Sequence, residues 1–107
     1  MNERRAFTRY AIQLPINVST SVRRDRVGMI RDVSASGVRF QCFSRFAVGE
    51  RVELMFRLLD TPDTAMGQVV RTDPVANVDT VYRFVTTVQF DAPLDVPLHE
   101  VAARVVD

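Results

Sequence analysis

Hydrophobic and polar residues alternate along most of the chain, with the period of two that is typical of half-buried strands. The pattern is clearest near the start, at the alternate positions Ile12, Leu14, Ile16 and Val18. It returns in five later segments, each bounded by short turn-like stretches. We therefore expect six strands, within residues 12–19, 26–33, 38–42, 52–58, 65–72 and 81–90.

Two of these strands contain a residue that disturbs regular pairing. Pro15 has no amide hydrogen to donate, so we expect the first strand to lie at a sheet edge or to carry a bulge. Gly67 stands inside the fifth strand, which indicates a bulge there or a close approach of another backbone.

The last segment has a different period. Its apolar residues fall at i, i+3, i+4 and i+7, on one face of a helix, and they are Leu98, Val101, Ala102 and Val105. We expect the helix at about residues 95–106, with Asp95 as its cap and Pro97 in its first turn.

Six short strands followed by one short helix favour an all-β fold. The predicted architecture is a compact six-stranded antiparallel β-barrel, with the short C-terminal α-helix covering an end or a side of it. Residues 1–10 are polar and have no pattern. We interpret them as a flexible arginine-rich N-terminal segment ahead of a barrel domain at residues 11–107.

The composition is that of one ordinary globular domain, with 107 residues, 47% of them hydrophobic and 25% charged. The net charge is only +1, but it is unevenly spread. Residues 1–57 hold eleven arginines and five acids, whereas residues 58–107 hold three arginines and eight acids. The chain has no lysine, and a genomic bias in codon use is the favoured explanation. Arginine is also the better residue for forked contacts with phosphate or a guanine edge. The asymmetry indicates an anionic partner for the first half.

The same composition bears on location. No apolar run approaches the length of a membrane span, and the charged start lacks the apolar stretch of a secretory signal. The single cysteine, Cys42, can form neither an intrachain disulfide nor a zinc site, and we interpret it as an apolar filler on a strand. These features favour a reducing, cytoplasmic setting.

Nothing in the sequence indicates catalysis. The single histidine, His99, lies in the predicted helix without partners at metal-ligand spacing. There is no nucleophile elbow, no P-loop and no carboxylate pair at a spacing that suggests acid–base chemistry. We therefore predict a protein that is not an enzyme and that holds no metal.

Nucleic-acid binding is an alternative, because small barrels often bind single strands through arginines and stacking aromatics. Two observations weigh against it. Phe40 and Phe56 fit the core phase of their strands, and the pI of about 8.0 is low for such a binder. The aromatic residues near the arginines are Phe7, Tyr10, Phe40, Phe43 and Phe46.

Two short motifs carry the strongest functional signal. The first is R-x-x-x-R, formed by Arg5 and Arg9 with Arg4 directly before it. The second is D-x-S-x-x-G, in the stretch DVSASG at residues 32–37. Taken alone, the first is a solvated tail. The second is a β-turn in which Asp and Ser bond local amides and Gly takes a positive φ.

In this order and separation, the two motifs resemble the signature of the PilZ domain family, bacterial receptors for cyclic di-GMP. The resemblance covers nearly the whole chain, including a six-stranded split barrel, a trailing helix and the strand MGQVVRTD. It implies that Arg5 and Arg9 close over the phosphates and guanines of the ligand. It also implies that Asp32 and Ser34 take polar edges of a guanine, while Gly37 shapes the turn and lets the ligand approach the backbone.

The resemblance has further implications for ligand number and mechanism. An arginine at the position of Arg4 is associated in the family with an intercalated ligand dimer. Arg71 is a further candidate contact, and the alternative is a solvated residue at a strand end. The ligand would order the N-terminal segment, and the domain, as a monomer or weak homodimer, would signal to an unidentified effector protein in motility, polysaccharide secretion or biofilm formation. The alternative functions are a ligand-independent adaptor and a single-stranded nucleic-acid binder.

Overall fold

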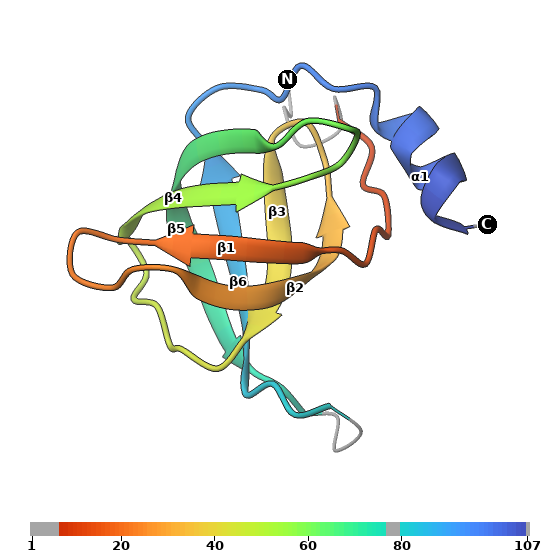
Figure 1. Ribbon diagram of the computed structural model, residues 1–107. Helices are drawn as coiled ribbons and strands as arrows, with labels where there is room; N and C mark the ends of the chain where they lie inside the picture. Colours follow the sequence, from red (N-terminus) through yellow and green to blue (C-terminus); the bar gives the residue numbers. More distant parts are fainter. Residues whose placement is uncertain (1–6, 77–79, 107) are drawn as a thin grey trace.

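The computed structural model describes residues 7–76 and 80–106, and it shows six strands followed by one helix (Figure 1). Each strand lies where the period of two predicts one, with ends that differ by a few residues. The elements are β1 Pro15–Ser19, β2 Arg26–Val33, β3 Gly37–Cys42, β4 Arg51–Phe56, β5 Asp63–Pro74, β6 Phe84–Phe90 and α1 Leu98–Val106.

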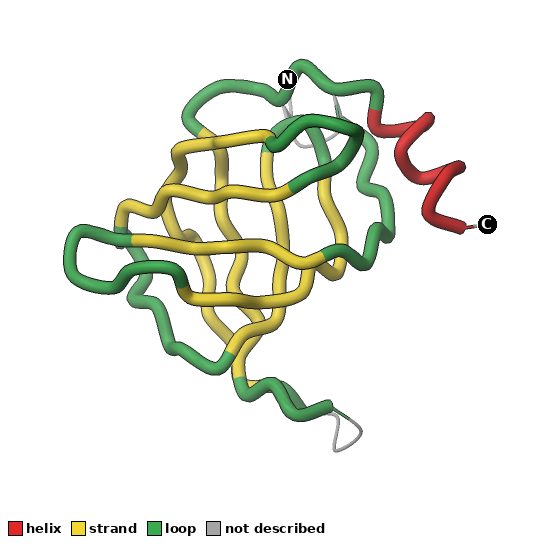
Figure 2. The backbone as a smooth tube through the Cα atoms, in the orientation of Figure 1, coloured by secondary structure: helices red, strands yellow, loops and turns green. Residues whose placement is uncertain are grey.

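The six strands form a closed barrel (Figure 2). Their order around it is β1-β2-β3-β6-β5-β4. β1 completes the ring, because it pairs with β2 on one side and with β4 on the other. Every neighbouring pair is antiparallel. The predicted six-stranded antiparallel β-barrel with a short C-terminal helix is thus confirmed.

Alternate residues of the strands point inward and fill the barrel. Burying one such side chain stabilises the fold by about 1.5–3 kcal/mol, which makes this core the main source of stability. Phe46, from the loop after β3, packs edge-to-face on Phe40 with ring centroids 6.4 Å apart. The largest fully buried side chains are Phe40, Phe46, Ile12, Ile16, Ile30, Leu54, Val18, Val33, Val38, Val52, Val69 and Val88.

Pro15 does not mark an edge strand, so that prediction is wrong. It is the first residue of β1, the position where a strand tolerates a missing donor. The carbonyl of the preceding Leu14 still accepts a hydrogen bond from the amide of Ile30, at 2.8 Å. β1 begins at Pro15, later than predicted, although Ile12 is already fully buried.

Gly67 lies where β5 runs close to β6. A Cβ at this position would stand 2.5 Å from the backbone oxygen of Gln89 and 2.7 Å from Cγ1 of Val88. The predicted close approach is therefore present. The irregularity of this strand pair falls elsewhere, between Val69 and Arg71.

The helix α1 lies outside the ring of strands (Figure 1) and buries Leu98 and Val101 against the core. It begins later than predicted, because the carbonyl of Pro97 accepts its first hydrogen bonds, from the amides of Glu100 and Val101 at 3.0 and 3.2 Å. Pro97 is therefore the capping residue, and the prediction that Asp95 has this role is wrong. No helix in the described residues has the length and apolar character needed to cross a membrane.

Candidate functional site

A bulge in β2 decides where Asp32 points. Ile30 lies opposite Phe40, but the pairing then shifts so that Asp32 lies opposite Arg39. Successive residues of a regular strand point to opposite faces, so Asp32 would share the inward face of Ile30. The extra residue at Arg31 turns Asp32 to the outer face instead, which is a common use of bulges at functional sites.

β5 carries a second bulge with the same effect. Val69 lies opposite Val88 in the core, and the pairing then shifts so that Arg71 lies opposite Thr87. The extra residue is Val70, and its insertion turns Arg71 to the outer face.

The two bulges align one row of polar side chains across four strands. Asp32 of β2 is opposite Arg39 of β3, Arg39 is opposite Thr87 of β6, and Thr87 is opposite Arg71 of β5. We call these four residues the polar row. With neighbouring strands about 4.8 Å apart, the row spans on the order of 14 Å of the barrel surface.

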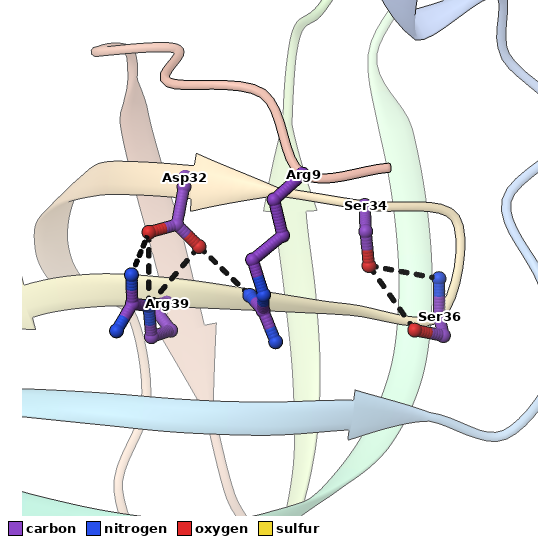
Figure 3. Close-up of polar contacts among 5 residues, drawn as sticks. All are labelled: Arg9, Asp32, Ser34, Ser36 and Arg39. Atoms are coloured by element: carbon purple, nitrogen blue, oxygen red, sulfur yellow. Dashed lines mark hydrogen bonds and ion pairs between the residues drawn. The ribbon is translucent and has the colours of Figure 1, made fainter. Parts of the chain in front are cut away.

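Asp32 is held by two arginines (Figure 3). Nη1 of Arg9 donates to Oδ1 of Asp32 at 2.8 Å. Nε of Arg39 donates to Oδ1 at 3.1 Å and to Oδ2 at 2.9 Å, and Nη2 of Arg39 also donates to Oδ2. The carboxylate therefore has a forked partner within the sheet and a second partner from the N-terminal segment.

The two arginines set the charge state of Asp32. Burial raises the pKa of this carboxyl, but the hydrogen bonds and charges of Arg39 and Arg9 outweigh burial and hold the pKa below its usual range. The same contact raises the pKa of Arg39. The side chain of Asp32 is only 12% exposed, whereas those of Arg9 and Arg39 are 48% and 41% exposed. The three side chains thus present a covered anion between two accessible cations.

The D-x-S-x-x-G stretch forms the hairpin between β2 and β3. The amide of Ser34 donates to the carbonyl of Gly37 at 2.9 Å, and the amide of Ser36 donates to Oγ of Ser34 at 3.2 Å. The hydroxyls of Ser34 and Ser36 lie 3.1 Å apart (Figure 3). Ser34 therefore bonds a local amide as predicted, but Asp32 bonds the two arginines instead.

Gly37 is needed for a different reason from the predicted one. The described glycine with a positive φ is Gly49, at 94°, so the predicted positive φ at Gly37 is wrong. A Cβ on Gly37 would stand only 2.5 Å from the backbone oxygen of Val88. The residue is small because β3 and β6 approach closely at this point.

The N-terminal segment enters the site at its last two residues. Tyr10 pairs with Val33 through two backbone hydrogen bonds of 2.8 and 2.9 Å, and this pairing places Arg9 beside Asp32. Arg4 and Arg5 lie outside the described residues. The structure thus joins the end of the first motif to the start of the second.

A groove of about 880 Å³ runs along the outer face of β2, β3, β6 and β5. Four arginines line it, namely Arg9, Arg31, Arg39 and Arg71, and we call it the arginine groove. Arg71 is 72% exposed and is paired with Asp73, through Nε and Oδ2 at 2.7 Å. Predicted Arg71 therefore shares the groove with Arg9, and the groove has the charge to hold an anionic ligand.

Sequence reasoning missed Arg31, Arg39 and Thr87. Arg39 alternates with the core residues Val38 and Phe40, so its outward direction was readable. Its pairing with Asp32 depends on the bulge in β2. In the sequence, the only sign of that bulge is a weaker alternation of hydrophobic and polar residues along this strand.

Other candidate residues are part of the fold. Phe40 and Phe46 are fully buried, so they are not available to stack on a base. Cys42 is buried, and burial raises the pKa of its thiol. Across residues 7–76 and 80–106, no three His, Cys, Asp or Glu side chains gather as a metal ion would require.

The fold and the site define a small β-barrel domain that offers an arginine-lined groove and a two-motif junction on one outer face. The family model of the PilZ domain matches residues 3–107, and the chain belongs to this family. No curated protein matches the sequence significantly.

Two solved structures show the same fold. The first is the Bacillus subtilis inhibitor of motility (MotI/DgrA), with a TM-score of 0.71, 14% identity and coverage of 98% of this chain. This chain spans 50% of that protein's chain. The second is the PilZ domain of YcgR from Escherichia coli with c-di-GMP, with a TM-score of 0.61, 12% identity and coverage of 96% of this chain and 86% of that one.

Proposed function

We propose that this chain is a non-catalytic receptor for cyclic di-GMP that binds the ligand in the arginine groove. The observation that carries the proposal is the 2.8 Å contact between Arg9 and Asp32 at this groove, because it joins the two motifs of the family. Family membership supports the choice of ligand. The YcgR domain, which shares the fold, was solved with c-di-GMP.

The groove, together with the Asp32 carboxylate that two of its arginines contact, has the groups that such a ligand requires. Arginines can fork onto a phosphate or onto the O6/N7 edge of guanine, and the groove offers four of them. Asp32 only accepts hydrogen bonds when ionised, which suits the N1–H and N2–H donors of guanine. Ser34 lies just after β2, in the hairpin next to Asp32, where it is buried. Arg71 lies in the polar row two strands beyond Arg39.

The proposed switch is an exchange of partners at Asp32. In the structure Arg9 neutralises this carboxylate. The ligand's phosphates would draw Arg9 away together with Arg5, and a guanine would take its place on Asp32. Residues 1–10 would then change conformation over the ligand, at an entropic cost that offsets part of the binding free energy.

The consequence would be a changed surface for an effector protein in the cytoplasm. The process under its control would be motility or biofilm formation, which the resemblance to the family implies. Arg4 would extend the site to a second, intercalated ligand molecule.

Isothermal titration calorimetry with cyclic di-GMP tests the receptor. We expect binding at micromolar ligand by the wild type and a strong loss in Arg5→Ala and Arg9→Ala. Arg51→Ala is a matched control, since Arg51 forms an ion pair with Asp91 outside the groove, and it should bind as the wild type does. If the wild type binds two ligand molecules per chain and Arg4→Ala binds one, the result would support binding of an intercalated dimer of the ligand.

Two results would overturn the proposal. One is a wild type that shows no binding, which would leave an adaptor that works without ligand. The other is unchanged affinity in both the Arg5 and Arg9 variants.

A further inference from the structure

Arg39 is in closer contact with Asp32 than the motif residue Arg9 is. It forms a fork on the carboxylate through Nε and Nη2, whereas Arg9 reaches one oxygen through Nη1. It also lines the arginine groove with a side chain that is 41% exposed. Arg39 therefore contacts the motif residue Asp32 and at the same time lines the arginine groove.

The backbone holds Arg39 more firmly than Arg9. Arg39 lies inside β3 and is paired with Asp32 of β2 on one side and Thr87 of β6 on the other. Arg9 precedes the barrel and is anchored through the single bridge of Tyr10 to Val33. Side chains on paired strands keep a binding geometry better than those on loose segments. When Arg9 leaves Asp32, Arg39 is the partner that stays.

The remaining pair offers an acceptor and a donor side by side. A guanidinium has five N–H donors, and the contacts with Asp32 use its Nε and Nη2 side. The Nη1 side is left to face another acceptor. Asp32 regains the one acceptor position on Oδ1 that Arg9 occupies in the structure.

Guanine matches this arrangement and adenine opposes it. The Watson–Crick edge of guanine carries the N2–H and N1–H donors next to the O6 acceptor. Adenine has an acceptor at N1 and a donor at N6, the reverse order. An ionised carboxylate cannot donate to adenine N1, and an arginine cannot accept from adenine N6.

We propose that Asp32 and Arg39 act as one guanine-selecting pair. Asp32 accepts from N1–H and N2–H, while Arg39 donates to O6 and keeps the carboxylate in place. This proposal rests on the proposed function and names the residue that makes the site specific for guanine. Arg39 is then both a ligand contact and a positioning residue for Asp32.

Titrations with cyclic di-GMP and with cyclic di-AMP test the pair. The measured quantity is the ratio of the two affinities, for the wild type, Arg39→Met, Arg39→Lys and the control Arg51→Met. The control removes an arginine that also forks onto an aspartate, Asp91, through Nη1 and Nη2, but outside the groove. Circular dichroism and thermal unfolding establish that each variant is folded.

We expect the wild type and the control to prefer cyclic di-GMP. In Arg39→Met the preference should fall by about tenfold or more, because the O6 contact is lost and the bidentate contact of Asp32 with the base is no longer held in place. Arg39→Lys keeps the charge but not the planar fork. It should therefore recover affinity for both ligands without recovering the preference.

The outcomes separate the two proposals. A wild type that binds no cyclic di-GMP overturns the receptor itself. A wild type that binds it, with the preference unchanged in folded Arg39→Met, overturns the role of Arg39 and leaves the receptor intact. An equal loss of both affinities also overturns selection by this pair. If Arg39→Met does not fold, the ratio in Arg39→Lys decides.

Discussion

Asp32 keeps its negative charge at a largely covered position because two arginines compensate it. Burial raises the pKa of its carboxyl, and the stronger effect of Arg39 and Arg9 lowers it below the usual value. The unfolded chain, with an aspartate pKa of about 3.9, therefore takes up a proton first as the pH falls. The stability that Asp32 contributes is present at neutral pH and is lost as the pH falls from the unfolded pKa through the folded one.

We predict that Asp32→Asn lowers the free energy of unfolding by about 1–3 kcal/mol at pH 7, because the forked arginine loses its charged acceptor. The difference from the wild type should shrink between pH 7 and about pH 3, since the wild type then loses the same contribution. Urea denaturation at both pH values measures it. Asp91→Asn is the control, because the exposed Arg51–Asp91 pair is screened by solvent. A difference that stays constant into acid would contradict the assignment.

Apart from Arg71, a candidate from its place near the end of a strand, the residues of the candidate site were predictable only where spacing marks them. Arg9, Asp32, Ser34 and Gly37 stand at fixed intervals in the sequence. Nothing marks Arg39, because polar residues are common on the outward face of a strand. Its importance comes from a contact between two strands, which depends on register rather than on spacing.

At the scale of elements, the two bulges convert a plain barrel face into a site. Alternation predicts where strands lie, because each inward position must join the core. Alternation does not predict a bulge. One extra outward residue changes no core residue, so the inward positions on both sides of the bulge remain apolar. In β5 the neighbours Val69 and Val70 are both valine, yet the first is 1% exposed and the second 45%. The strands were therefore readable from the sequence, whereas the polar row was not.

Deletion of Arg31 should remove the bulge of β2. The chain beyond it would then either turn Asp32 toward the core or shift the pairing with β3. Breaking the partly buried ion pair in this way should lower the free energy of unfolding by about 3 kcal/mol or more. Arg31→Ala keeps the residue count and should change stability by no more than about 0.5 kcal/mol.

Thermal and urea unfolding of the two variants, followed by circular dichroism, measure this difference. Equal stability of the deletion and of Arg31→Ala would show that the bulge does not direct Asp32.

At the scale of the molecule, barrel closure gathers charge that the sequence separates. Three arginines of the groove come from the basic first half of the chain, and Arg71 comes from the acidic second half. β6 brings them together, because it lies between β3 and β5 in the ring. The net charge of the whole chain is only +1, so the attraction for an anion is local to this face. A ligand that neutralises the groove would also remove the repulsion that opposes bringing further N-terminal arginines onto it.

Limited proteolysis with trypsin tests whether the ligand brings the N-terminal arginines onto the groove, because trypsin cleaves after arginine. If cyclic di-GMP draws residues 1–10 over the groove, saturating ligand should slow cleavage after Arg4 and Arg5 by about tenfold or more, in proportion to the closed population. Cleavage after Arg57, which is exposed at the end of β4 and outside the groove, should keep its rate. Mass spectrometry of timed samples gives each rate separately.

Slower cleavage at all three sites would indicate general stabilisation by the ligand. Unchanged cleavage after Arg4 and Arg5 in a chain that binds cyclic di-GMP would place the switch elsewhere. Protection confined to the first two sites is the outcome that ties the N-terminal arginines to the ligand rather than to the barrel alone.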